Sequence, residues 1–273
     1  MSLAPGLKAA VKSLVPRGLI YATYEQRLLR DLDRGRLPQH VAVLADGNRR
    51  WAKAQGLPGF MGHSEGVMAF RRVMVACCEL GINVLTVYAF SSENWRRTEE
   101  EINVLMELFE SYCYSERELM KEIGVQFRVI GKTDVLNPKV LEAFRELTEY
   151  TKDGNRMVLN VCINYGSRFE ILEASKKIAG DVKTGKLGID DITEEVFSEC
   201  LYTKGLPDPD LMIRTSGELR ISNFLLWQNA YAEFWFTDLY WPDFDKKTLL
   251  TAILDYQGRD RRFGGGAPST PQK

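Results

Sequence analysis

Residues 40–51 read His40-Val41-Ala42-Val43-Leu44-Ala45-Asp46-Gly47-Asn48-Arg49-Arg50-Trp51. Five apolar residues follow His40, and such a short apolar run is typical of a strand buried on both faces of a sheet. A glycine turn then places one carboxylate beside two arginines. In open α/β sheets ligands bind at the carboxyl ends of the strands, so this stretch predicts both a buried parallel strand and a ligand-binding loop behind it.

Similar β-rich runs recur along the chain and alternate with longer amphipathic ones. Strands are predicted near 41–45, 84–90, 125–130, 157–163, 210–214 and 233–237. A helix is predicted over 64–80 with Gly81 as its cap, and others begin at the capping boxes Thr98 to Glu101 and Ser167 to Glu170. The alternation predicts an α/β fold with one six-stranded, mostly parallel sheet, surrounded by helices on both faces.

The length of 273 residues and the hydrophobic content of 45% predict one large domain. Residues 1–38 have apolar positions at helical spacing and end at Pro38, which indicates an N-terminal helical arm. We expect this arm to pack on the domain, with a position on a membrane surface as the alternative. The main domain then spans 39–264, and the Gly-, Pro- and Ser-rich tail 265–273 is expected to be disordered.

The charge is balanced, with 36 basic against 37 acidic residues, so composition does not favour broad binding to nucleic acid. The five cysteines have no Cys-x-x-Cys spacing and indicate buried free thiols in a reducing compartment. The most apolar stretch, 73–90, is interrupted by polar residues, so we expect neither a membrane-spanning segment nor a secretory signal.

The loop after the first strand can bind an anion. Exposed backbone N–H groups near Gly47, together with Arg49, Arg50 and His63, would surround a phosphate. Asp46 cannot bind phosphate directly and would instead hold a cation, so the loop suits a diphosphate bridged to protein by Mg²⁺. An Asp-Gly turn with solvated arginines is the alternative for this loop taken alone.

Polar side chains also follow other predicted strands. The segment from Ser91 to Arg97 could by itself be a helix-capping loop, whereas Arg214 and Arg220 suit a second phosphate-bearing ligand because guanidinium groups match phosphate oxygens. A structural arginine network is the alternative there. Glu233 is a carboxylate within an apolar run and would need a partner such as a metal ion. Two anion sites and two carboxylates at one sheet edge fit a reaction that joins two phosphorylated substrates.

Several common sites are absent from the sequence. It has no G-x-x-x-x-G-K-[ST] loop, no G-x-G-x-x-G motif, no G-x-S-x-G elbow and only two histidines, which are not spaced as zinc ligands. The acidic pair Asp190 and Asp191 precedes a helix start at Thr193 and is interpreted as local capping.

The sequence resembles the cis-prenyltransferase family, which includes undecaprenyl and dehydrodolichyl diphosphate synthases, from about residue 40 to residue 264. The resemblance is carried by motifs in the right order at 40–42, 46–52, 62–63, 88–95, 164–166, 207–211, 213–218, 220–228 and 241–242. It implies a catalytic domain over 39–264 that elongates prenyl chains and binds its product in an internal hydrophobic tunnel.

The resemblance also implies roles for individual residues. Asp46 and Asn94 would be catalytic. The allylic diphosphate would be bound by Gly47, Asn48, Arg49, Arg50, Trp51, His63 and Trp95. The isopentenyl diphosphate would be bound by Ser91, Arg97, Arg214, Arg220, Ser222 and Gly264. Mg²⁺ would be held by Asp46, with Glu233 supporting the metal site.

Three positions depart from the family pattern. Gly59 stands where bacterial members usually have an arginine, which weakens one phosphate contact. Arg49 replaces the usual glycine, as in eukaryotic-type members, and Leu219 replaces a polar residue after Glu218.

Each five-carbon unit that enters the tunnel is worth about 4 kcal/mol on burial, so a growing chain needs an apolar lining. The expected lining is Ala89, Leu105, Leu108, Phe109 and Val161, with Met157 near the far end by analogy with the family. Small Ala89 and the lack of an insertion after 99–122 favour a medium-length product, and Tyr112 or Tyr114 could shorten it. A short-chain synthase and a noncatalytic subunit of a heteromeric enzyme are the alternatives.

The family further implies a homodimer formed through the C-terminal half, with Arg262-Phe263-Gly264 reaching the partner's active site. We expect a cytoplasmic protein that binds no nucleic acid and associates with membranes, if at all, peripherally for product release. A plastid location is left open.

Overall fold

The computed structural model describes residues 17–260, with side chains described from Thr23 onward. The predicted role of Gly264, the tail 265–273 and the first part of the predicted arm lie outside these residues.

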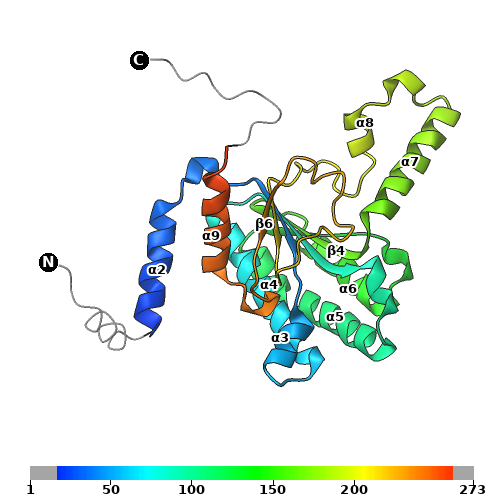
Figure 1. Ribbon diagram of the computed structural model, residues 1–273. Helices are drawn as coiled ribbons and strands as arrows, with labels where there is room; N and C mark the ends of the chain where they lie inside the picture. The colour runs from blue at the N-terminus through cyan, green and yellow to red at the C-terminus, as the bar shows by residue number, and fades with distance from the viewer. Residues whose placement is uncertain (1–16, 261–273) are drawn as a thin grey trace, which may run out of the picture.

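One sheet of six strands forms the centre of the molecule (Figure 1). The strands are β1 (His40–Leu44), β2 (Val84–Ser91), β3 (Val125–Ile130), β4 (Met157–Tyr165), β5 (Leu211–Arg214) and β6 (Glu233–Phe236). They lie in the order β3-β4-β2-β1-β5-β6, and every pairing is parallel. The predicted α/β fold is therefore confirmed. Because β1 lies between β2 and β5, the chain turns to opposite sides of β1, and a crevice at the carboxyl ends of these strands is where such sheets bind ligands.

Helices connect and flank the strands. They are α2 (Arg17–Asp31), α3 (Asn48–Ala54), α4 (Gly59–Leu80), α5 (Glu99–Glu122), α6 (Pro138–Tyr150), α7 (Ser167–Lys183), α8 (Glu194–Ser198) and α9 (Lys246–Gln257), and short 3₁₀ turns include η2 (Ser92–Arg96) and η5 (Trp241–Asp243). Gly81 caps α4 with a φ of 87°, a conformation that glycine adopts without strain. Thr98 caps α5, accepting a hydrogen bond from the Glu101 N–H at 3.3 Å.

The predicted capping box at Ser167 and Glu170 is wrong. Gly166 is the N-cap of α7, and the Ser167 hydroxyl instead accepts the Leu226 N–H at 2.8 Å. Glu170 is buried and accepts hydrogen bonds from the Tyr165 hydroxyl and the Tyr202 N–H. A serine and a glutamate at the right spacing are thus used for tertiary contacts.

The two faces of the sheet are covered differently. Alternate residues such as Val41, Val43 and Val87 pack with α4, α5, α6 and α9, whereas Ala42 and Leu44 pack with an irregular segment that contains Phe224 and Leu225. The surrounding helices are therefore unevenly distributed, and the larger core lies on the α4–α5–α6 side. In Figure 1, α7 and α8 extend away from the sheet.

The described part of the N-terminal arm packs on the domain. Helix α2 lies along α9 (Figure 1), and its residues Leu28 and Leu32 are buried in the main core. Just after α2 in the sequence, the Asp33 N–H donates to the Gln257 side chain at 3.1 Å. The expected packing of this helix is confirmed for these residues.

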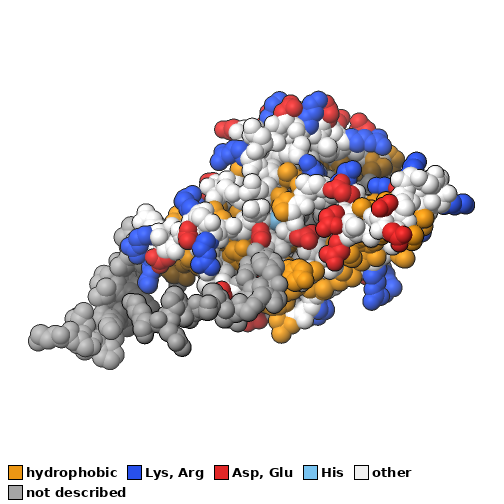
Figure 2. Space-filling view, turned by 90° about the horizontal axis from the view of Figure 1, so that it is seen from above, with side chains coloured by type: hydrophobic (Ala, Val, Ile, Leu, Met, Phe, Trp, Pro, Cys, Tyr) orange, Lys and Arg blue, Asp and Glu red, His pale blue; other side chains and the backbone are white. Residues whose placement is uncertain are grey.

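The cysteines are free thiols, of which Cys200 is half-buried and the other four are buried. Among residues 17–260, no helix combines the length and the apolar character that crossing a membrane requires. Figure 2 shows basic and acidic side chains side by side on the face seen from above, in keeping with the balanced charge of the chain.

Candidate active site

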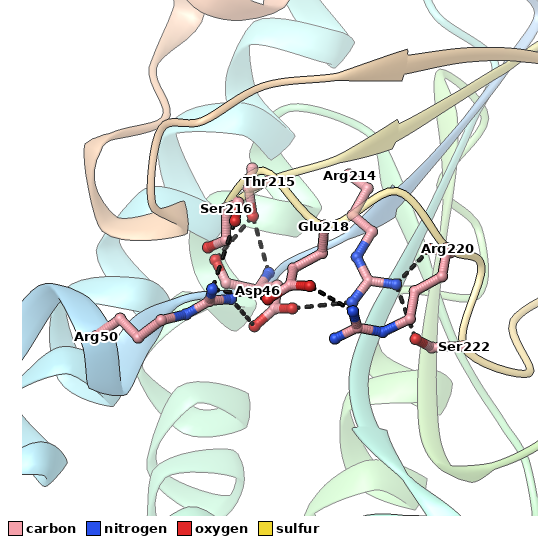
Figure 3. Close-up of polar contacts among 8 residues, drawn as sticks. All are labelled: Asp46, Arg50, Arg214, Thr215, Ser216, Glu218, Arg220 and Ser222. Carbon is pink, nitrogen blue, oxygen red and sulfur yellow. Dashed lines mark hydrogen bonds and ion pairs between the residues drawn. The ribbon is translucent and has the colours of Figure 1, made fainter.

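Asp46 lies just beyond the carboxyl end of β1, and its backbone is fixed from two sides. The Asp46 N–H donates to the Thr215 hydroxyl at 2.8 Å, and the Asp46 carbonyl accepts the Trp241 N–H at 2.9 Å. Its carboxylate lies between two guanidiniums, with Arg214 Nη2 at 3.0 Å from one oxygen and Arg50 Nη2 at 3.2 Å from the other (Figure 3). The carboxylate and the two cations predicted from the first and third loops therefore meet.

Arg214 ends β5 and is almost fully buried, with 2% of its side chain exposed. Its Nη1 donates to the Ser222 hydroxyl at 2.7 Å and to the Arg220 carbonyl, while its Nε has no partner in the described residues. Burial lowers the pKa of Arg214 and Asp46 counters that effect, yet a guanidinium stays charged in proteins. Arg214 is a fixed positive group at the sheet edge.

Glu218 links two arginines that sequence reasoning had assigned to phosphates. It accepts a hydrogen bond from Arg50 Nη1 at 2.8 Å and another from Arg220 Nη1 (Figure 3). The Arg220 side chain is 59% exposed and lies outside the described cavities. Within the chain as described, Arg220 contributes its backbone carbonyl, not its guanidinium, to the Arg214 contact.

Glycines let α3 and α4 approach the site closely. Gly47 has a φ of 101°, and a Cβ there would lie 2.0 Å from the Ser216 hydroxyl. A Cβ at Gly62 would lie 2.0 Å from the Asn48 carbonyl oxygen, and one at Gly66 would lie 2.7 Å from the Asn48 side chain. The glycines thereby bring Asn48 next to the helix that carries His63.

Three charged or polar groups gather around Glu101 of α5, one each from α3, α4 and the residue that follows η2. Its carboxylate accepts from Arg97 Nη1 at 2.9 Å and lies 3.4 Å from His63 Nε2 and 3.5 Å from Arg49. Burial and the charge of Arg97 lower the pKa of His63, so its imidazole is neutral at pH 7. The Asn48 amide lies 3.4 Å from His63 Nδ1. Sequence reasoning had interpreted Glu101 as a capping residue alone, because Thr98 and Glu101 already satisfied a capping pattern.

The η2 loop after β2 also reaches the site. The Asn94 side-chain oxygen accepts the Ser91 N–H at 3.0 Å, which fixes the amide within the turn. Trp95 instead donates to the Asn164 side chain at 2.8 Å and packs edge-on against Phe90. Trp51 donates to Asp243 at 2.8 Å. Neither tryptophan lines these two cavities, and their contact with the allylic diphosphate stays a prediction.

A cavity of about 570 Å³ begins among these polar groups and continues into the core. Its polar lining comes from the ends of β2 and β5, from the loops that follow β1, β2 and β5, and from α3 and α4, namely Asp46, Asn48, His63, Ser91, Glu93, Asn94, Arg97, Arg214, Ser222 and Asn223. Its apolar lining includes all five residues expected in the tunnel, Ala89, Leu105, Leu108, Phe109 and Val161. Tyr112 also lines it, whereas exposed Tyr114 and buried Met157 do not, and the role of Met157 at the far end stays a prediction.

The depth of the cavity follows from the strand register. Phe127, which lines it, pairs through Leu159 and Leu85 with Val41, five residues before Asp46. At about 3.3 Å per residue, the lining extends roughly 16 Å along the strands below Asp46. The cavity therefore joins a charged opening to a long apolar interior.

A second cavity of about 680 Å³ adjoins the charged end. It shares Asp46, Asn48, His63 and Arg97 with the first and adds Arg49, Arg50 and Lys53. Two neighbouring spaces thus share the Asp46 carboxylate, as two phosphorylated ligands would require.

Glu233 does not belong to this site. It is the first residue of β6 and pairs in register with Leu211, the first residue of parallel β5, so it lies at the amino edge of the sheet. Its carboxylate accepts a hydrogen bond from Arg259 at 2.8 Å. Asp46 lies beyond the opposite, carboxyl edge. The prediction that the two carboxylates lie at the same edge of the sheet is wrong, because Glu233 begins its strand. Its support of a metal site stays a prediction.

Comparison with known proteins identifies the family of this chain. Residues 44–264 match the family described as "Putative undecaprenyl diphosphate synthase". The chain belongs to the cis-prenyltransferase family. It is 50% identical over 241 residues to an isoprenyl transferase from Heliobacterium mobile, covering 88% of this chain and 93% of that protein. As a member of this family, the chain is a prenyltransferase.

Other relatives support the family and the fold. The chain is 49% identical over 228 residues to a ditrans,polycis-undecaprenyl-diphosphate synthase, (2E,6E)-farnesyl-diphosphate specific, from Aliivibrio fischeri, covering 84% of this chain and 89% of that protein. Among solved structures, lavandulyl diphosphate synthase from Lavandula x intermedia, in complex with dimethylallyl diphosphate, superimposes with a TM-score of 0.82 at 38% identity, covering 84% of this chain and 98% of that one.

Proposed function

We propose that this prenyltransferase condenses isopentenyl diphosphate with an allylic diphosphate, either farnesyl or geranyl diphosphate, and releases diphosphate and a Z-polyprenyl diphosphate of medium length. The observation that carries the proposal is the single cavity that joins Asp46 and Arg214 to an apolar interior about 16 Å deep. A diphosphate would bind at the charged end, and its hydrocarbon would lie along Leu105, Phe109 and Val161.

The reaction needs a leaving diphosphate to be stabilised while an alkene attacks. The allylic C1–O bond breaks, C4 of isopentenyl diphosphate bonds to that C1, and a proton leaves C2 to form the new double bond. Arg214, Arg97 and Arg50 would stabilise charge on the diphosphates as the C–O bond breaks. The two neighbouring cavities would hold the two substrates side by side, which removes much of the entropic cost of their encounter.

Mg²⁺ fits this site as an ion carried by the diphosphate. Among residues 17–260, no group of three or more potential ligands is arranged for a metal, and Asp46 is the carboxylate at the charged end shared by both cavities. Mg²⁺ is commonly held by one or two carboxylates together with substrate phosphates and water. When bound there by Asp46, the ion would supply Lewis-acid stabilisation of the departing diphosphate.

The homodimer remains part of the proposal. Strand β6 stands at one edge of the sheet and is half-buried along its whole length, including Phe234, Trp235 and Phe236. The neighbouring Tyr231 is 69% exposed. A second copy that covers this edge would bury these aromatic side chains. We propose peripheral contact with a membrane during product release, because the product carries a long hydrocarbon chain. A cytoplasmic location is also part of the proposal.

The test is incubation of the purified protein with Mg²⁺, labelled isopentenyl diphosphate and farnesyl or geranyl diphosphate, with product length read by chromatography. Asp46→Asn should reduce turnover by about 100-fold or more, because it removes the negative charge that would hold the cation. Asp190→Asn, at an exposed aspartate in a turn before α8, is the matched control and should elongate like the wild type. No product with any allylic primer would refute the enzyme proposal in favour of a noncatalytic subunit.

A further inference from the structure

Glu93 stands out among the residues that line the cavity. Two of the described lining residues carry carboxylates, Asp46 and Glu93. Asp46 is paired with Arg214 and Arg50, whereas Glu93 has hydrogen bonds but no ion pair in the described part of the chain. A carboxylate that is not neutralised by a guanidinium remains available to accept a proton.

Two neutral groups donate hydrogen bonds to the Glu93 carboxylate. Asn223 Nδ2 donates to one oxygen at 3.2 Å, and the Ser92 hydroxyl donates to the other at 3.1 Å. Asn223 is itself oriented, because its side-chain oxygen accepts the Arg168 N–H at 2.9 Å. The Glu93 carboxylate is therefore positioned by a network that reaches back to the start of α7.

Gly166 allows this network to form. A Cβ at Gly166 would lie 2.7 Å from Asn223 Nδ2 and 2.8 Å from the Ser92 hydroxyl oxygen. Asn223 and Ser92, the two donors to Glu93, thus pack against Gly166, which has no side chain. The arrangement is specific to a glycine at position 166.

The network continues to the other carboxylate of the cavity. Asn223 follows Ser222, whose hydroxyl accepts a hydrogen bond from Arg214, and Arg214 is paired with Asp46. All of these side chains line the same cavity. The adjacent residues Ser222 and Asn223 thus connect the two carboxylates, with Asp46 on the cationic side and Glu93 on the side of neutral donors.

We propose that Glu93 is the catalytic residue that accepts the proton from C2 of isopentenyl diphosphate, an inference that rests on the proposed function. After the new C–C bond forms, the positive charge lies on C3 of the isopentenyl unit. The C2–H bond then breaks, its electron pair forms the C2–C3 double bond, and the proton bonds to a Glu93 carboxylate oxygen. No oxidant or further reactant is needed.

The ionisation of Glu93 suits this role. Burial acts to raise the pKa of Glu93, but hydrogen bonds from its own backbone, Asn223 and Ser92 outweigh it and hold the pKa below its ordinary value. The carboxylate is therefore charged at neutral pH. A proton beside a carbocation is so acidic that a weak base in the right place can remove it. Because the Glu93 side chain is exposed at the charged end, it can pass the proton to water before the next cycle.

The experiment compares the wild type with Glu93→Gln and Glu93→Ala, using isopentenyl diphosphate with either hydrogen or deuterium at both C2 positions. Turnover by Glu93→Gln should fall by about 100-fold or more, the range of a lost general base, with the KM for isopentenyl diphosphate changed by less than about threefold. The variant should also show a primary deuterium isotope effect on kcat larger than that of the wild type, since proton removal becomes slow. Added formate should restore part of the activity of Glu93→Ala.

The matched control is Glu99→Gln, at an exposed glutamate in the first turn of α5, which should show wild-type turnover and no increase in the isotope effect. An isotope effect in Glu93→Gln equal to that of the wild type, or no rescue by formate, would overturn the assignment and leave Glu93 a structural residue of the loop. Elongation by the wild type in the same assay keeps this outcome distinct from a failure of the proposed function.

Discussion

The ion pair between Asp46 and Arg214 joins a half-buried carboxylate to a guanidinium that is almost fully buried. Leaving such a guanidinium without partners would cost several kcal/mol, so Asp46, Ser222 and the Arg220 carbonyl stabilise it before any substrate binds. A diphosphate that enters would offer Arg214 stronger partners and free Asp46 for a cation. The pair thus holds both side chains in place at the carboxyl end of β1.

His40 provides a prediction at the same scale. Its ring is buried, with Nδ1 2.7 Å from the Pro207 carbonyl and Nε2 2.7 Å from the Thr86 hydroxyl. The carbonyl can only accept, so Nδ1 carries the proton and Nε2 accepts from Thr86. Burial lowers the pKa of His40 to about 4, against attraction from Asp210. The folded state therefore holds this imidazole neutral.

Stability should consequently fall in acid through His40. Its pKa is lower in the folded than in the unfolded state, so the unfolded chain takes up the proton first as the pH drops below about 6.5. Between pH 7.5 and pH 5 the free energy of unfolding should fall by about 2 kcal/mol from this group alone. Urea unfolding of the wild type and of His40→Asn at both pH values isolates the effect. Equal pH dependence in the two proteins would contradict it.

At the scale of elements, the close contact of α3 with α4 sets the position of Asn48 and His63. Gly62 is the point of closest approach, since a Cβ there would lie 2.0 Å from the Asn48 backbone oxygen. Gly62→Ala should therefore force the two helices apart, lower the free energy of unfolding by about 1–3 kcal/mol and raise the KM for the allylic diphosphate. Chemical unfolding and steady-state kinetics measure the two effects.

Gly180→Ala is the control for this substitution. Gly180 lies within α7, is exposed, and has no atom within 4 Å of the position of a Cβ. The same change there should stabilise the protein by about 0.5–1 kcal/mol, because alanine favours a helix over glycine. If Gly62→Ala were as stable as the wild type, the proposed steric limit between α3 and α4 would be wrong.

The elements were predictable from the sequence because the strands are rich in apolar and β-branched residues, and the loops that carry Asp46 and Asn94 directly follow two of them. The partners of Trp51 and Trp95 were not predictable, because their indole N–H groups donate to Asp243 and Asn164, which are far away in the sequence and which no local pattern indicates. Glu233, by contrast, was misplaced: the predicted strand 233–237 already put it at the start of β6, and a parallel strand begins at the edge opposite the site.

At the scale of the whole molecule, the sheet brings together loops that are distant in the chain, and an apolar cavity extends from them into the molecule. The cavity lies with the larger core, where α4 and α5 contribute lining beside β2, β3 and β4. Sequence reasoning could place Ala89 and Phe109 there, because they lie on elements next to a site loop. It could not place the far end, since the residues that close a cavity are set by packing between α5, α6 and β3.

The far end of the cavity should set product length. The structure places Phe127 in the cavity lining, whereas the resemblance to the family indicates Met157. Phe127 lines the cavity and packs on Phe144, whereas Met157 is equally buried but outside the lining. Phe127→Ala should open space below the cavity, and each further isoprene unit buried there would gain about 4 kcal/mol. Its products should be longer than those of the wild type by at least one unit when separated by chromatography.

Met157→Ala is the counterpart, because it also removes a buried apolar side chain. Both substitutions should lower the free energy of unfolding by about 2–5 kcal/mol, so loss of stability alone cannot explain a difference in product length between them. Lengthening in Met157→Ala but not in Phe127→Ala would mean that the chain grows toward the start of β4, against the lining seen in the structure. Lengthening confined to Phe127→Ala would place the growing end between β3 and α6.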